Sequence, residues 1–461
     1  MTSSTHGSTR SAAIWIKNPR ACWTGNSQDA SNGLVIQGNN IIELVAAGKS
    51  PDSVYDYSFD ASDHVVLPGL INCHHHFYQT LTRALPGALN KELFPWLQAL
   101  YPVWSNLNDD AIFASTQLAL SELLLSGCTT AADHHYVFSS IMPHAIDAQV
   151  AAAKTIGNRV TLTRGSMSLG QSKGGLPPDS VVESDEKILS ESERLINSYH
   201  DTSEDSFCKI ALAPCSPFSV TPDLMRETAL LAQQKVVLLH THLGETEDEN
   251  NFCLKQFGMR PVDYLDDVGW LNNRVWLAHG IHFNEEEIAR LGHACVGICH
   301  CPTSNMLLAS GMCHTRDLQR AGAPVGLGVD GSASNDGSNM IQEVRQAMLL
   351  QKLRYGSANF THIDALKLAT SGSAKLLHRP ELGELAVGKK ADLALFSLNE
   401  LRFSGHGDPL AALVLCGAHK ADYVMVAGEW KVKNGEMVDV DINDVMALHG
   451  IAAKRLREMT M

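Results

Sequence analysis

The sequence predicts an α/β fold, a (β/α)₈ barrel of the TIM type with a small flanking β-domain built from both ends of the chain. Three observations predict it. Eight nearly continuous apolar runs end in polar or His-rich tips, helix-like segments alternate with these runs, and β-rich segments with Gly turns occupy the two chain ends. Buried parallel strands have continuous apolar sequences, and eight of them alternating with helices are typical of this barrel.

The same texture divides the 461 residues into three parts. Residues 1–63 are expected to form the N-terminal part of the β-domain, after a polar and disordered start of ten residues. Residues 64–380 are expected to form the barrel, and residues 381–461 the rest of the β-domain with a terminal helix near 443–459. The eight barrel strands are predicted within 64–76, 128–135, 159–168, 209–217, 235–246, 274–283, 295–305 and 324–335. Helices between them are predicted near 109–126, 221–234, 285–291 and 340–353.

The composition excludes several classes of partner. Hydrophobic residues make up 44% of the chain, which is enough for an ordinary globular core. The 50 acidic residues outnumber the 36 basic ones, which argues against nucleic acid or an anionic membrane surface as partner. No apolar run is long enough to predict a transmembrane helix. The 11 cysteines lack a regular pairing pattern, so we expect a cytoplasmic protein. The expected partner is a small-molecule substrate, and a homo-oligomer is possible.

Residues that can carry chemistry gather at the strand tips, which form one face of such a barrel. Alternate residues of a strand share a face, so His74 and His76 point the same way and form half of a metal site. Further candidates follow at the fifth, sixth and eighth tips: His240, His242, Glu245, His279, His282 and Asp330. A lone buried His is more often a core residue, but imidazole and carboxylate groups at four tips indicate one converging site for Zn²⁺ or Fe²⁺.

Several longer motifs carry a resemblance to a known family. They read PGLINCHHHFYQTLTRALPG, HTHLGET, LAHGIHF, HCPTSNMLLASG and GLGVDGSASND, and GKKADLALFSL lies near the C-terminal end. In combination they resemble the deaminase and chlorohydrolase branch of the amidohydrolase superfamily. The resemblance extends over nearly the whole chain and implies an enzyme on a metal-bearing TIM barrel.

The resemblance also implies a role for each residue of the site. It implies one divalent metal per chain, Zn²⁺ with Fe²⁺ as the alternative, bound by His74, His76, His242 and Asp330. Binuclear relatives use a carbamylated Lys at the fourth tip, where this chain has Ala213, Pro214 and Cys215, so a single metal is expected. The implied catalytic residues are Glu245 as proton carrier, His279 as the group that orients water, and Asp330 as acceptor of the water proton.

The implied reaction is hydrolytic deamination of a cyclic amidine. An oxidised purine, 8-oxoguanine, is the leading substrate, which would give urate and ammonia. Guanine and hydroxytriazines are alternative substrates, because relatives that act on them share the same metal and catalytic residues. An inactive scaffold protein is an alternative of another class, and the intact set of site residues argues against it.

The substrate contacts are the least specific part of the prediction. Gln79 offers a donor and an acceptor in the loop after the first strand, and Trp96, with Tyr101 and Trp104, could cover a flat heterocycle or simply pack. Arg164 and Arg83 are candidates for an oxo group, with salt bridges as the alternative. The group that separates 8-oxoguanine from guanine is expected in the loops after the second to fourth strands, with these candidates: Arg164, Cys215 and Phe218.

Overall fold

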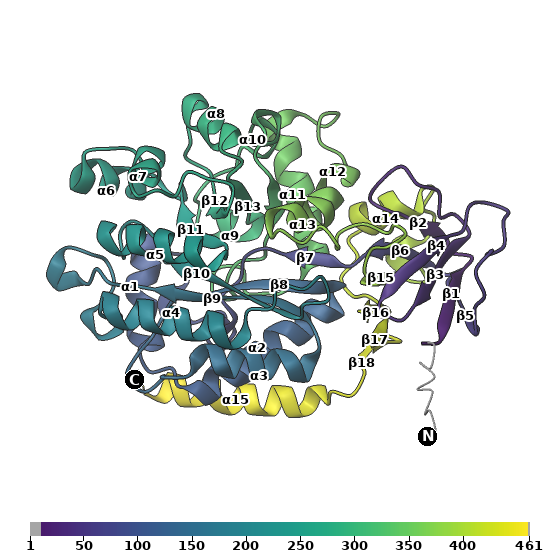
Figure 1. Ribbon diagram of the computed structural model, residues 1–461, viewed down its shortest axis with the longest axis horizontal. Coiled ribbons are helices and arrows are strands. Elements are labelled where there is room, and N and C mark those ends of the chain that lie inside the picture. Colours follow the sequence, from purple (N-terminus) through teal and green to yellow (C-terminus); the bar gives the residue numbers. More distant parts are fainter. Residues whose placement is uncertain (1–10, 460–461) are drawn as a thin grey trace, which may run out of the picture.

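The computed structural model describes residues 11–459, so the polar first ten residues lie outside the described part. Its centre is one sheet of eight strands paired in chain order, which lie between the surrounding helices in Figure 1. The strands are β7 (Leu70–Asn72), β8 (Cys128–His135), β9 (Arg159–Ser166), β10 (Cys208–Pro214), β11 (Leu239–Leu243), β12 (Val275–His279), β13 (Gly297–His300) and β14 (Val325–Leu327). All neighbouring pairs are parallel. The predicted TIM-type barrel is confirmed.

Backbone hydrogen bonds join the first and last strands of this sheet at the end that carries the predicted site. The Cys73 N–H donates to the Leu327 carbonyl at 2.9 Å, and the Asp330 N–H donates to the His74 carbonyl at 3.0 Å. The Val329 N–H donates to the Asn72 side chain at 2.9 Å. These bonds bring the first tip beside the eighth, although more than 250 residues separate them in the chain.

Helices surround the barrel and pack their apolar faces on its outer surface. The longer ones are α2 (Asp109–Leu125), α3 (Ala145–Ile156), α4 (Asp185–Tyr199), α5 (Pro222–Lys235), α6 (Glu247–Phe257), α8 (Glu285–His293) and α11 (Met340–Tyr355). The shorter ones are α7 (Pro261–Asp267), α9 (Pro302–Leu307), α10 (Thr315–Ala321), α12 (His362–Lys367), η5 (Leu368–Gly372) and α13 (Ser373–Leu376). Asn and Ser or Thr side chains cap several of them; Asn108, for example, accepts the Ala111 N–H at the start of α2.

The segment after the first strand covers the site. It contains η1 (Phe77–Thr82), η2 (Pro86–Ala88) and α1 (Leu93–Trp104). All six residues of η1 and seven of the twelve residues of α1 are buried, so this segment is part of the core. It covers one side of the site, and residues 77–104 are called the roof segment from here on.

The flanking domain consists of two sheets made from both chain ends. One has the order β4-β3-β1-β5 and the other β18-β17-β16-β15-β6-β2. The N-terminal strands are β1 (Ala13–Lys17), β2 (Ala21–Cys22), β3 (Gly33–Gln37), β4 (Asn40–Leu44), β5 (Tyr57–Asp60) and β6 (His64–Pro68). The C-terminal elements are β15 (Leu393–Ser397), η6 (Leu401–Phe403), α14 (Pro409–Leu415), β16 (Tyr423–Val426), β17 (Glu429–Lys433) and β18 (Glu436–Met437).

The run 64–76, predicted as one barrel strand, is two strands in different sheets. β6 pairs with β15 of the flanking domain, and the barrel begins only with β7. Gly69 lies between them and packs against β8, where a Cβ atom would stand 2.2 Å from Thr129 Oγ1. The apolar pattern is continuous through Gly69 because both strands are buried, so it does not reveal the change of sheet.

The terminal helix α15 (Ile442–Glu458) leaves the flanking domain and lies along α2 on the barrel, as Figure 1 shows in yellow. It also reaches the roof segment, where the His449 ring nitrogen Nε2 lies 3.1 Å from Thr80 Oγ1. Within residues 11–459, none of the helices combines the length and apolar character needed to cross a membrane.

Candidate metal centre and active site

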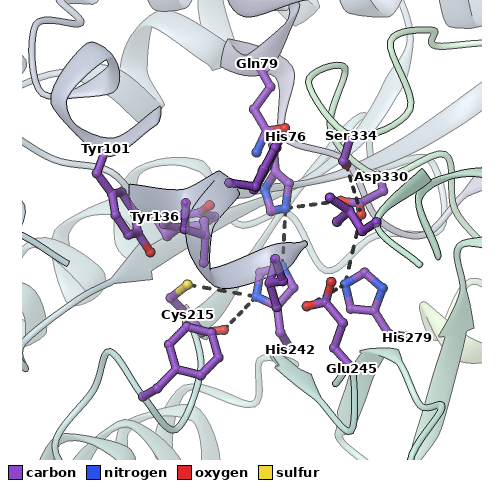
Figure 2. Close-up of a pocket in the computed structure, with 15 residues that line it drawn as sticks. His76, Gln79, Tyr101, Tyr136, Cys215, His242, Glu245, His279, Asp330 and Ser334 are labelled. Carbon is purple, nitrogen blue, oxygen red and sulfur yellow. Dashed lines mark hydrogen bonds and ion pairs between the residues drawn. The ribbon is translucent and has the colours of Figure 1, made fainter. Parts of the chain in front are cut away.

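The tips of β7, β11 and β12 and the turn after β14 meet at one end of the barrel. They bring together the side chains of His74, His76, His242, His279 and Asp330, all of which are buried. Figure 2 shows the rings of His76 and His242 directed at one another, and His76 directed also at the Asp330 carboxylate. The structure thus brings together all four residues that the sequence predicts as metal ligands.

The hydrogen bonds of His76 and His242 fix the direction of their ring lone pairs. His76 Nδ1 lies 2.6 Å from the His134 carbonyl, and His242 Nδ1 lies 2.7 Å from the Cys215 carbonyl. A carbonyl oxygen only accepts, so both Nδ1 atoms carry the proton. In neutral rings both Nε2 lone pairs then face each other at 3.2 Å. Two facing lone pairs repel, and a cation between them removes the repulsion.

His74 is oriented through a second histidine. His240 Nδ1 lies 2.8 Å from the Trp276 carbonyl and therefore donates, which leaves His240 Nε2 as an acceptor. His74 Nδ1 lies 2.8 Å from that Nε2 and donates to it. The remaining nitrogen of His74, Nε2, has no hydrogen-bond partner within residues 11–459 and lies 3.2 Å from Asp330 Oδ1. His240 thus sets the tautomer of a candidate ligand, as outer-shell groups do at metal sites.

The donor set fits a divalent cation. Asp330 Oδ1 lies 3.2 Å from His74 Nε2 and 3.3 Å from His76 Nε2. Ligand atoms of His74, His76 and His242 lie close enough together to share one ion, as do those of His74, His279 and Asp330. Three imidazole nitrogens and one carboxylate oxygen are ligands that Zn²⁺ and Fe²⁺ accept.

The charges of these groups suit the same ion. Burial, followed by the neighbouring histidines, lowers the pKa of His242 well below its usual value. Burial also lowers the pKa of His74, so both rings are neutral and able to bind a metal. Asp330 Oδ1 accepts the Gly331 N–H at 2.7 Å and Oδ2 accepts the Ser334 hydroxyl at 3.4 Å, and these hydrogen bonds favour the ionised form. Asp330 is therefore a carboxylate.

Glu245 and His279 form the proton-handling side of the site. Glu245 Oε2 lies 3.5 Å from His279 Nε2, and His279 Nε2 lies 4.0 Å from Asp330 Oδ2. Burial, followed by the charge of Asp330, raises the pKa of Glu245 well above its usual value, which favours the protonated form of this carboxyl. A buried neutral acid beside a carboxylate is the arrangement that separates the roles of acid and base.

Two of these residues adopt strained backbone conformations. His279 has φ of +75° and Asp330 has φ of +63°, in the left-handed region that residues other than Gly seldom occupy. Such strain collects at functional sites because the surrounding structure must hold it in place. Here it turns both side chains inward at the ends of β12 and β14.

A pocket opens onto these groups. Gln79 and Trp96, predicted as substrate contacts, both line it. Gln79 Oε1 has no hydrogen-bond partner in the described part of the chain, whereas the Trp96 indole N–H donates to the Ala333 carbonyl at 3.0 Å. Gly331 leaves room for Gln79, because a Cβ atom there would stand 1.9 Å from Oε1. The remaining lining residues are His76, Leu93, Leu97, Tyr101, Tyr136, Cys215, Phe218, His242, Glu245, His279, Leu308, Asp330 and Ser334.

Arg164, predicted as a substrate contact, does not line the pocket, and that prediction is corrected. Its guanidinium binds Glu183 at 2.7 Å, donates to the Gly165 carbonyl and lies 3.8 Å from the centre of the Phe138 ring. Arg83 is likewise engaged, in an ion pair with Glu122. The sequence analysis counted Arg164 among the loops after the predicted strands, whereas Arg164 lies within β9, and the sequence could not show which way its long side chain turns.

Other residues of the site escaped the sequence analysis. Ser334 Oγ donates to Asp330 Oδ2 at 3.4 Å, and Asn305 Oδ1 lies 3.0 Å from His279 Nδ1. Tyr136 also lines the pocket. It follows β8 directly, two positions after His134, and alternation along a strand could have placed these two side chains on the same face. The fourth strand contributes no ligand; its Cys215 carbonyl orients His242 instead.

The comparisons with known proteins agree with this fold and site. Residues 65–431 match the model of the amidohydrolase family. An 8-oxoguanine deaminase of Pseudomonas aeruginosa is 59% identical over 96% of this chain and 98% of its own length. A hydroxydechloroatrazine ethylaminohydrolase of a Pseudomonas species is 37% identical over 81% of this chain and 79% of its own. The solved structure of an atrazine chlorohydrolase from Arthrobacter aurescens, complexed with zinc, is 31% identical and superposes with a TM-score of 0.90 over 95% of this chain and 100% of that one.

These matches define the class of the protein. The chain belongs to the amidohydrolase family. The predictions of this family and of an aminohydrolase enzyme are confirmed.

Proposed function

We propose that this enzyme deaminates 8-oxoguanine hydrolytically, with urate and ammonia as products. The observation that carries the chemistry is the position of the Glu245 carboxyl, 3.5 Å from His279 Nε2, beside the cluster of imidazoles and the Asp330 carboxylate. The substrate follows from the similarity to the P. aeruginosa deaminase, which extends over nearly the whole of both chains.

The metal would be held by His74, His76, His242 and Asp330, one ion per chain. A divalent cation bound there supplies Lewis acidity, which brings the pKa of water at the site into the neutral range. Zn²⁺ is the proposed ion, because the similar chlorohydrolase structure contains zinc, and Fe²⁺ is the alternative. The cytoplasmic location and a homo-oligomeric state stay predictions.

The side chains of the site divide the proton transfers among them. The Asp330 carboxylate accepts a proton from the attacking water, and His279 Nε2, 4.0 Å from Asp330 Oδ2, holds the water oxygen toward the substrate. Glu245 delivers its proton to the ring nitrogen next to the attacked carbon. Asp330 passes the proton taken from water to the exocyclic amine, the carbon–nitrogen bond to that amine breaks, and ammonia leaves. The hydroxyl proton of the intermediate returns to Glu245 as the carbonyl forms. One water is consumed for each ammonia released.

Gln79 and Trp96 would hold the heterocycle in the pocket. Gln79 Oε1 is buried and has no hydrogen-bond partner among the described residues. It can therefore accept an N–H of the purine. The Trp96 ring is fixed by its bond to Ala333, so it can cover the flat substrate without losing side-chain freedom on binding.

An ammonia-release screen tests the proposal. The purified metal-loaded enzyme would be offered 8-oxoguanine, guanine, isoxanthine, cytosine, S-adenosylhomocysteine and hydroxyatrazine. We expect the highest kcat/KM with 8-oxoguanine. A preference for guanine or the hydroxytriazine would replace the proposed substrate, and no ammonia from any compound would favour the scaffold alternative.

A further inference from the structure

We propose that the hydroxyl of Tyr101 recognises the oxygen at position eight of the purine and so makes the enzyme prefer 8-oxoguanine to guanine. This inference rests on the proposed function. It assigns the discrimination to α1, in the roof of the pocket, and not to the loops after the second to fourth strands.

Tyr101 carries an unsatisfied polar group inside the pocket. Its side chain lines the pocket and is 1% exposed, and its hydroxyl has no hydrogen-bond partner among residues 11–459. A buried hydroxyl without a partner destabilises a folded protein by about 1–3 kcal/mol. Its presence in the wall of a substrate pocket is therefore best explained by a partner that arrives with the substrate.

The hydroxyl lies on the side of the pocket away from the metal cluster. In Figure 2, Tyr101 is across the pocket from Asp330 and His279, with its hydroxyl directed inward. The ionisable groups that act on it electrostatically are Cys215 first, then Tyr78, and last Glu245. Cys215 Sγ lies 3.9 Å from Nδ1 of His242, which is the ring nitrogen that points away from the metal cluster.

The shape of the substrate matches this separation. The carbon that loses its amine, C2, is in the six-membered ring of the purine, and C8 is at the opposite end of the fused five-membered ring. With C2 placed at the metal cluster, C8 lies toward the far wall of the pocket. An oxygen at C8 accepts a hydrogen bond from a hydroxyl there, whereas guanine presents only a C–H group to it.

The three residues that the sequence analysis named for this role are engaged elsewhere or poorly suited. Arg164 is paired with Glu183 and does not line the pocket. Cys215 offers only a thiol, which is a weak donor, and Phe218 offers none. A site that depends on a hydrogen bond rejects an analogue that lacks the partner, because its own polar group then stays unpaired.

The test compares Tyr101→Phe with the wild-type holoenzyme on 8-oxoguanine and on guanine. Removal of the hydroxyl leaves the oxygen at C8 buried without a donor, so we expect kcat/KM for 8-oxoguanine to fall about 10–100-fold. Guanine should change less than about twofold, since it makes no bond to the hydroxyl. The loss should fall mainly on KM, because the hydroxyl is far from the reacting atoms. Inhibition by urate should weaken by the same factor and inhibition by xanthine should not.

Tyr264→Phe is the matched control. Tyr264, in α7, is also 1% exposed with an unpartnered hydroxyl, but it lies outside the pocket. Both variants should keep or raise Tm, since each removes an unsatisfied group. Only Tyr101→Phe should change the ratio of the two substrates. An unchanged ratio in an active, folded Tyr101→Phe would overturn the inference alone. A wild-type enzyme without activity on 8-oxoguanine would overturn the proposed function, and the inference with it.

Discussion

Two buried polar clusters occupy the opposite ends of the barrel, and they are built on different principles. At the junction with the flanking domain, the Arg159 guanidinium binds the Asp392 carboxylate through Nε at 2.9 Å and Nη2 at 3.2 Å. Its Nη1 donates to the carbonyls of Asp205 and Ser206 at 3.0 Å each. Asp392 Oδ1 also accepts the Ala427 N–H at 2.8 Å. Every nitrogen of this guanidinium has an acceptor.

At the catalytic end, the partners are incomplete. The Nε2 atoms of His76 and His242 point at each other at 3.2 Å, and His74 Nε2 has no hydrogen-bond partner in the described part of the chain. A satisfied buried ion pair needs nothing further and holds two parts of a fold together. An unsatisfied set of acceptors is stable only with a ligand that supplies positive charge or protons. The difference therefore separates a structural cluster from a functional one.

Removal of the metal tests the comparison most severely. A chelator should reduce ammonia release by about 10⁴-fold or more, because Lewis acidity and an available nucleophile are lost together. Zn²⁺ added back should restore activity at one ion per chain, measured by elemental analysis. Asp330→Asn should bind metal poorly and behave like the chelated enzyme. Two ions per chain at full activity would contradict the single-metal proposal.

Glu245→Gln tests the proton carrier at the same end. The amide keeps the shape of the carboxyl but cannot deliver a proton, so kcat should fall by about 10²–10⁴-fold. The metal content should stay at the wild-type value, since Glu245 is not a proposed ligand. If the variant keeps wild-type kcat with a full complement of metal, another group carries the proton.

Arg159→Met tests the cluster at the junction with the flanking domain, where we expect a loss of stability and not of activity. It leaves Asp392 as a buried charge without its partner, which should lower the free energy of unfolding by about 3–5 kcal/mol. The kcat of the folded variant should stay within about twofold of the wild type, because the pair is at the other end of the barrel. Arg226→Met is the control: Arg226 is in an exposed pair with Asp267, whose loss should cost at most about 1 kcal/mol. Equal destabilisation by both variants would contradict this account.

The last prediction concerns the pH dependence of stability and Glu249, which lies in α6 next to the catalytic end of the barrel. Its Oε1 accepts the Gly244 N–H at 2.6 Å, and burial raises its pKa to about 8. Between pH of about 4.5 and 8 the folded chain holds a proton there that the unfolded chain has lost, so stability falls as pH rises. Glu249→Gln cannot ionise and should remove up to about 1.4 kcal/mol per pH unit of this decline. Urea unfolding of the holoenzyme at several pH values measures both slopes; identical slopes would show that Glu249 does not titrate in this range.

The sequence by itself determined the barrel and the tips that form the site. Eight buried runs require helices on their outer side, and this fixes the alternation, the parallel sheet and the common face of the tips. Alternation along a strand placed His74 and His76 on one face. These features are local or follow from chain order, which is why a sequence can reveal them.

Only the tertiary structure decided how the polar groups are paired. The carbonyls of His134 and Cys215 set the tautomers of His76 and His242, and Glu183 draws Arg164 out of the pocket. The hydroxyl of Tyr101 has no hydrogen-bond partner within residues 11–459, although nothing in its local sequence marks it. Hydrogen bonds act over about 3 Å between groups far apart in the chain, so their partners are known only when the whole fold is in place.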